Sequence, residues 1–115
     1  MAETSIRSEL IPFIGECLSG RGEVGEISYL LAESPFPYKV LLRNLVFDNG
    51  IALEHCWVSC NMVCGIDTGD AVTFEGIVYR YRKKTPKGIY NKQNRTVQRQ
   101  YTDYGLTRGF ISPIF

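Results

Sequence analysis

Basic side chains gather in one segment near the end of this 115-residue chain. Residues 82–101 contain seven Lys or Arg and no Asp or Glu. A row of such cations neutralises phosphate groups, so this composition is typical of a segment that follows a nucleic-acid backbone. A second interpretation stays open, in which the segment is only a solvated loop. The candidate cations are Arg80, Arg82, Lys83, Lys84, Lys87, Lys92, Arg95 and Arg99.

Aromatic residues accompany these cations. Tyr79, Tyr81 and Tyr90 lie within or beside the basic segment, and Trp57 lies upstream of it. Unpaired bases stack on flat rings with about 1–3 kcal/mol per base and little dependence on base identity. Cations together with rings predict binding of single-stranded DNA or RNA with weak sequence preference. The alternatives are that the tyrosines pack as ordinary strand residues and that Trp57 belongs to the core.

The chain is close to neutral, with a formal net charge of +1, but its charges are unevenly distributed. Residues 1–79 hold four basic residues against eleven acids, a net charge of −7. Residues 80–115 hold nine basic residues against one acid, a net charge of +8. This division predicts an anion-binding element on an acidic body, unless the two parts pair with each other.

Four potential metal ligands lie close together: His55, Cys56, Cys60 and Cys64. Their spacing lacks the two-residue separation of zinc knuckles. His55 and Cys56 are neighbours, so a regular strand would point them to opposite faces. We therefore expect no metal and no cofactor, and we interpret the three cysteines as buried thiols.

Catalytic groupings are equally sparse in the sequence. The chain has one histidine, and the adjacent Glu54 would leave a strand from the face opposite His55. Asp67 and Asp70 lie in a turn-forming stretch, where capping accounts for carboxylates. A metal-dependent nuclease needs several carboxylates around its ions, and the sequence has no such cluster. These patterns predict a binding protein rather than an enzyme.

Hydropathy and the N-terminal residues bear on location. Apolar residues make up 44% of the chain, and no apolar run approaches the roughly 20 residues that cross a bilayer. The N-terminal segment lacks a cationic region followed by an apolar one, so we expect no signal peptide, no membrane partner and a cytoplasmic location. In that setting the cysteines are expected to be thiols rather than disulfides.

The strongest structural signal is a hairpin. Two β-rich runs, Tyr38–Phe47 and Ile51–Val58, flank a turn that contains Asn49-Gly50. Asn-Gly favours a tight primed turn, because both residues tolerate positive φ. Alternation along the second run then places Leu53 and Trp57 on one face of the strand.

The remaining elements predict a mainly β fold, a small five-stranded barrel with a short N-terminal helix, since a sandwich usually needs about seven strands. We expect a helical segment at 1–20 and one barrel domain at 21–115, with a long basic loop at 82–103. In the first part of the chain we expect one or two helical pieces within 4–19, an irregular strand in 22–33 and a break at the prolines of 34–37. After the hairpin we expect a connection with room for a short helix at 61–70 and then a long strand over 71–81 that bends at Gly76. A last strand follows over 104–112.

Residues 69–78, Gly-Asp-x-Val-x-Phe-x-Gly-x-Val, resemble the fourth-strand pattern of OB-fold single-stranded nucleic-acid-binding domains. The resemblance implies an OB-like barrel over roughly 22–112, in which the loop between the fourth and fifth strands flanks the binding face. That loop would be the basic segment. The hairpin with its His55-x-Trp57 strand, followed by the Gly-Asp strand, is also similar to small OB-like proteins of phages and other mobile elements.

The alternative function is that of a protein-interaction or oligomerising module, for example a mobile-element accessory protein. The acidic N-terminal part would then bind a basic partner, or the basic loop of another copy in a homo-oligomer. The position of the aromatic side chains distinguishes the two functions. Exposed Trp57 and Tyr79 beside cations favour nucleic acid, whereas an exposed apolar patch elsewhere favours a protein partner.

Overall fold

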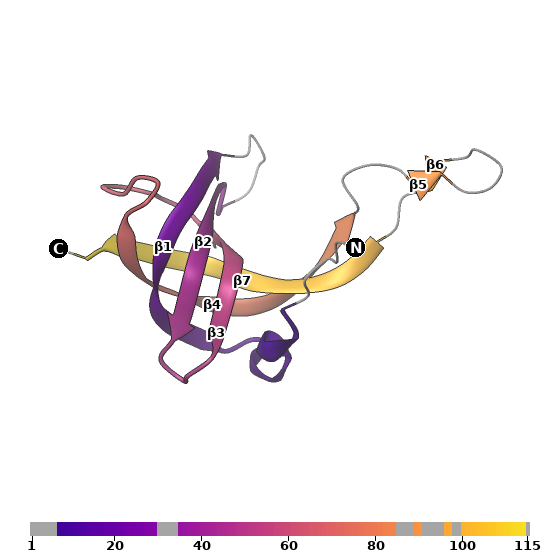
Figure 1. Ribbon diagram of the computed structural model, residues 1–115, viewed down its shortest axis with the longest axis horizontal. Coiled ribbons are helices and arrows are strands. Elements are labelled where there is room, and N and C mark those ends of the chain that lie inside the picture. The colour runs from indigo at the N-terminus through magenta and orange to yellow at the C-terminus, as the bar shows by residue number, and fades with distance from the viewer. Residues whose placement is uncertain (1–6, 30–34, 85–88, 91–95, 98–99, 115) are drawn as a thin grey trace.

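The fold is a closed β-barrel of five long strands (Figure 1). A computed structural model describes residues 7–29, 35–84, 89–90, 96–97 and 100–114, the side chains of 83–101 excepted. The barrel strands follow the order β1-β2-β3-β7-β4, and β4 closes the barrel by pairing with β1. The elements are η1 (Ser8–Phe13), β1 (Cys17–Tyr29), β2 (Tyr38–Phe47), β3 (Ala52–Cys60), β4 (Ala71–Lys84), β5 (Ile89–Tyr90), β6 (Thr96–Val97) and β7 (Gln100–Pro113).

This architecture confirms the predicted fold class: mainly β, a closed five-stranded barrel that is compatible with an OB-like fold, with one short helix near the N-terminus. The strands pair antiparallel except β3 and β7, which run parallel with Val58 opposite Leu106. Residues 61–70 form turns and bends without the short helix for which the sequence left room.

Alternation along β4 builds one wall of the core. Val72, Phe74 and Val78 are buried inside the barrel, as their spacing predicts. The predicted bend at Gly76 is also present, as a register shift against β7 between Glu75 and Ile77. A β-carbon on Gly76 would lie 2.9 Å from that of Leu106, so the missing side chain lets the two strands approach.

The β2–β3 hairpin is confirmed, but the predicted primed turn is wrong. The Gly50 N–H donates to the Phe47 carbonyl, and the Phe47 N–H donates to the Ile51 carbonyl, which leaves a three-residue loop. Only Gly50 in this loop has positive φ, and the Asn49 side chain accepts a hydrogen bond from the Ile51 N–H instead. A three-residue hairpin loop usually consists of a turn followed by a glycine in the left-handed conformation. Compared with a two-residue loop, it shifts the pairing of the two strands by one residue.

A second correction concerns the faces of β3. Leu53 and Cys56 both face the core, so Leu53 does not share a face with Trp57 as strict alternation predicted. On β2, the left-handed Asn44 (φ +51°) interrupts the alternation at the matching level, between buried Leu42 and Leu45. Paired strands twist together, so one left-handed residue on β2 changes which side chains of β3 point inward.

The N-terminal helical region is shorter than the sequence predicts. η1 is a 3-10 helix with Pro12 inside it, and β1 already begins at Cys17. Gly20, the last residue of the expected helical segment, lies in β1 opposite Phe47, where a β-carbon would clash with the β2 backbone. Leu10 of η1 is fully buried in the core, and η1 lies at one end of the barrel (Figure 1).

Two strands continue past the barrel and form a ribbon, which we call the arm (Figure 1). β1 pairs with β4 only as far as Ile77, and β3 pairs with β7 only from Leu106 onward. β4 and β7 nevertheless stay paired from Tyr79–Gly105 out to Lys84–Gln100. The arm therefore consists of residues 79–84 and 100–105, and both ends of the predicted basic loop are strand. Beyond the arm, β5 pairs with β6.

Candidate nucleic-acid interface

The outer surface of the β2–β3 hairpin carries both cations and an aromatic ring. The strand register places Leu41 opposite Trp57, between the pairs Lys39–Ser59 and Arg43–His55. Cys56 and Val58 face the core, so Trp57 leaves β3 on the outer side. Its ring is half-buried rather than enclosed, and the core cluster found among the described residues does not include it. Trp57 is therefore intermediate between the enclosed core residue and the exposed ring that the sequence left open.

Two tyrosines of β4 lie on the same outer surface. The rings of Tyr79 and Tyr81 are 5.4 Å apart between centroids and tilted by 30°. The two rings pack over Gly105 of β7, where a β-carbon would lie 3.3 Å from the Tyr81 ring and 3.6 Å from the Tyr79 ring. The same β-carbon would lie 3.1 Å from the Trp57 carbonyl oxygen, so the backbone of β3 at Trp57 passes beside this glycine. We call Trp57, Tyr79 and Tyr81 with Gly105 the aromatic face.

The tyrosine hydroxyls of the aromatic face are neutral at physiological pH. Burial raises the pKa of Tyr79, and a hydrogen bond with the Ser59 side chain offsets part of that rise. Burial and then the negative charge of Asp103 raise the pKa of Tyr81. Because neither ring becomes a phenolate near pH 7, neither repels a phosphate backbone.

The arginines of the arm leave β4 on the other side from the tyrosines. Arg80 and Arg82 are exposed, and alternation directs them away from the face of Tyr79 and Tyr81. They line a groove of about 470 Å³ together with Tyr81 and Thr102. The sequence suggested one path of interleaved rings and cations, but the strand separates them into two faces.

The other predicted site residues are placed less completely. Lys83 and Lys84 belong to β4 and Tyr90 belongs to β5, but their side chains are outside the described part of the chain. Lys87, Lys92, Arg95 and Arg99 lie wholly outside the described residues.

Two cations on the hairpin were missed by the sequence reasoning. Lys39 and Arg43 flank Leu41 on β2 and so stand diagonally across from Trp57. Arg43 also leans over β1, where a β-carbon on Gly25 would lie 2.6 Å from its Nε. The pairing register of the hairpin would have indicated these two cations, but only if the turn had been predicted with three residues.

A buried ion pair fixes the base of the arm, and no sequence pattern pointed to it. Arg7 is 4% exposed and Asp103 is 0% exposed. The Arg7 guanidinium donates to Asp103 Oδ2, and the Arg7 backbone N–H donates to Oδ1 at 3.1 Å. Arg7 Nε also donates to the His55 carbonyl at 2.8 Å, and the Tyr104 N–H donates to Asp103 Oδ1 at 2.8 Å. These bonds tie the N-terminal segment to β3 and β7, and they neutralise the one acid of residues 80–115.

The cysteines are thiols in two kinds of surroundings. Cys56 and Cys60 are buried in the core, where burial raises the pKa of Cys56 to about 12 and that of Cys60 to about 11. Cys17 and Cys64 are exposed, so the expectation that Cys64 is buried is wrong. Within the part of the chain that the structure describes, no three His, Cys, Asp or Glu side chains come close enough to hold a metal ion.

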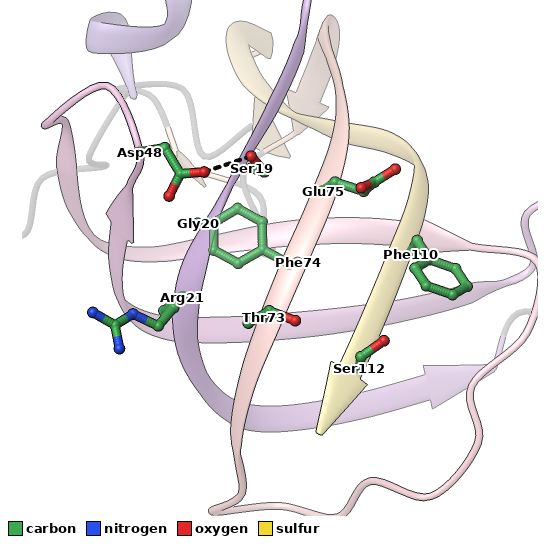
Figure 2. A pocket seen from close by; sticks show the side chains of 9 residues that line it. All are labelled: Ser19, Gly20, Arg21, Asp48, Thr73, Phe74, Glu75, Phe110 and Ser112. Carbon is green, nitrogen blue, oxygen red and sulfur yellow. Dashed lines mark hydrogen bonds between the residues drawn. The ribbon is translucent and has the colours of Figure 1, made fainter. Parts of the chain in front are cut away.

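A second hollow on the barrel has the wrong chemistry for a polyanion. It has a volume of about 400 Å³ and is lined by residues of β1, β4 and β7, including Arg21, Glu75 and Phe110, and by Asp48 of the hairpin turn. Figure 2 shows that its charged side chains do not converge on one point, and the Ser19 hydroxyl donates to Asp48 at 2.8 Å. Two carboxylates against one guanidinium disfavour phosphate binding here.

No protein-family model, curated protein or solved structure matches this chain significantly. None of the helices in the described residues is long and apolar enough to cross a membrane. We therefore base the functional proposal on the geometry and chemistry of the described side chains.

Proposed function

We propose that this protein binds single-stranded nucleic acid through the aromatic face, without catalysis and with weak sequence preference. The observation that carries the proposal is the packing of the Tyr79 and Tyr81 rings over Gly105, on the outer side of the sheet from which Trp57 also projects. A side chain that only fills the core would point into the barrel and would not lie on its outer surface. In OB-folds the surface of the second and third strands binds oligonucleotides, and Trp57 lies on β3 of this OB-like barrel.

In this proposal each ring supports one base and the cations bind the phosphates between bases. Base stacking on a protein ring contributes about 1–3 kcal/mol by alanine substitution. Gly105 lets the tyrosine rings lie close to the sheet. Lys39 and Arg43 supply positive charge on the neighbouring strand, so affinity decreases as salt increases.

Fluorescence anisotropy with a labelled single-stranded oligonucleotide tests the proposal. We expect Tyr81→Ala to weaken binding by roughly fivefold to a hundredfold, the equivalent of about 1–3 kcal/mol. Tyr81→Phe keeps the ring and should keep the affinity. Phe110→Ala is the matched control, because Phe110 is an exposed ring toward the other end of β7. Equal affinity for the wild type and Tyr81→Ala would contradict a role for the aromatic face.

A second candidate function is self-association, which a different surface favours. Met62 is 66% exposed and Phe110 is 64% exposed. Both line a groove of about 480 Å³ whose surroundings include Ile111 and Pro113. Exposed apolar side chains of this kind mark protein contacts when they gather. Light scattering on the wild type and on Phe110→Ala tests it, and a wild-type monomer at high concentration would remove this candidate.

A further inference from the structure

The two sides of the arm have different chemistry. One side continues the aromatic face and carries Tyr79 and Tyr81, whose rings rest on Gly105. The other side carries the exposed Arg80 and Arg82, which line a groove with Thr102 and Tyr81. A single strand that stacks on the tyrosines runs along the first side, so the arginines on the second side face a different phosphate backbone.

The arm also has the dimensions of an element that enters a DNA groove. It is a ribbon of two antiparallel strands, without a barrel strand on either edge along its described length. Its six residue pairs span about 20 Å at roughly 3.4 Å per residue. The major groove of B-form DNA is about 12 Å wide and admits a two-stranded β-ribbon. RNA duplexes have a major groove too deep and narrow for such an element.

The ion pair at the base makes the arm suitable for this role. Asp103 is the one acid of residues 80–115, and its charge is neutralised by Arg7 in the interior. The hydrogen bonds from Arg7 to His55 and to Asp103 also link the start of the arm to β3, which carries Trp57. The arm is thus held at a fixed position relative to Trp57 and presents no unpaired carboxylate among its described side chains.

We propose that the arm binds double-stranded DNA beside the single strand, so that the preferred ligand is a junction between single-stranded and duplex DNA. This inference rests on the proposed function, because the aromatic face provides the single-strand half of the site. Arg80 and Arg82 bind phosphates of the duplex, and the Thr102 hydroxyl lies in the same groove to donate to a phosphate oxygen.

Anisotropy with three labelled DNAs and one labelled RNA tests the inference: a DNA single strand, a blunt DNA duplex, a DNA junction with a single-stranded tail, and the same junction made of RNA. We expect the wild type to bind the junction at least fivefold more tightly than either other DNA. Arg80→Ala should remove that preference and leave the single-strand affinity within twofold. The slope of log affinity against log salt for the junction should decrease by about 0.9, the value for one lost phosphate contact. Arg21→Ala removes one exposed arginine from the hollow of Figure 2 and should leave the preference intact.

The possible failures point to different conclusions. Equal affinity for the junction and the single strand would overturn the inference while the proposed function stands. The inference is also overturned if Arg80→Ala weakens single-strand binding as much as junction binding, because Arg80 would then lie on the single-strand path. An RNA junction bound as tightly as the DNA junction would contradict the major-groove assignment. Absence of binding to all three DNAs at low salt would overturn both proposals.

Discussion

Replacement of Asp103 by Asn is expected to destabilise this barrel strongly. The substitution keeps the shape of the side chain, and the new Oδ1 can still accept from the Arg7 and Tyr104 N–H groups. The carboxylate oxygen that faces the Arg7 guanidinium becomes an NH₂ group, so two donors meet in the interior. The guanidinium is then a buried charge without its counterion, because both residues are almost fully enclosed.

The expected cost follows from this burial. Removal of one partner from a buried ion pair typically costs about 3–5 kcal/mol. A domain of this size has a total stability of about 5–15 kcal/mol, so the variant loses a large share of it. With a urea m-value of about 2 kcal/mol per M, the unfolding midpoint falls by about 2 M.

Urea unfolding followed by Trp57 fluorescence measures this loss. Trp57 is the one tryptophan of the chain, and it lies two residues from the His55 carbonyl that Arg7 binds. Asp48→Asn is the matched control, because Asp48 is an exposed aspartate that accepts one hydrogen bond from Ser19. We expect the control to change the stability by less than about 0.5 kcal/mol. A loss below about 1 kcal/mol in Asp103→Asn would refute the view that this pair holds the arm and the N-terminal segment together.

Three further predictions follow from the thiols and from Gly105. In the native protein a thiol reagent should modify Cys17 and Cys64 only, with Cys56 and Cys60 reacting after unfolding, as mass spectrometry would show. Rapid native labelling of all four would contradict the burial. The pKa values of Cys56 and Cys60 are raised from 9.0, so above pH 9 the folded state keeps protons that the unfolded state loses. The free energy of unfolding should therefore fall as the pH rises above 9, by up to about 1.4 kcal/mol per pH unit for each thiol. Denaturant unfolding that is unchanged from pH 8 to 10.5 would argue against this linkage. Gly105→Val should displace the tyrosine rings and weaken oligonucleotide binding at least fivefold, whereas wild-type affinity in a folded variant would show that ring position is unimportant.

The sequence predicted those parts of the fold that depend on local chemistry. The Asn49-Gly50 pair marked the hairpin, and the alternating residues from Val72 to Val78 marked β4 and its core face. The turn type was wrong because Gly50 alone takes positive φ, while Asn49 uses its side chain as an acceptor. That choice depends on the register of the whole hairpin, which two turn residues do not determine.

The parts that the sequence left unpredicted depend on contacts between distant residues. Arg7 and Asp103 are 96 positions apart, and neither belongs to a periodic pattern. Residues 82–84 and 100–103 of the arm were expected to belong to the basic loop, yet β4 and β7 pair along them. Pairing with a neighbouring strand extends a strand even where its residues are charged, when the charged side chains reach solvent on one face. Arg80 and Arg82 reach solvent in this way. The aromatic face required the same pairing, since only the register brings Trp57 and the tyrosines to Gly105.

Titration of Trp57 fluorescence with an unlabelled single-stranded oligonucleotide tests the central claim most directly. Trp57 is the one tryptophan, so every change in emission reports the aromatic face itself. We predict saturable quenching at low salt that weakens as salt is raised, because bases stack on the indole while cations hold the phosphates. Emission that stays constant at low salt over the whole titration would contradict single-strand binding at this face.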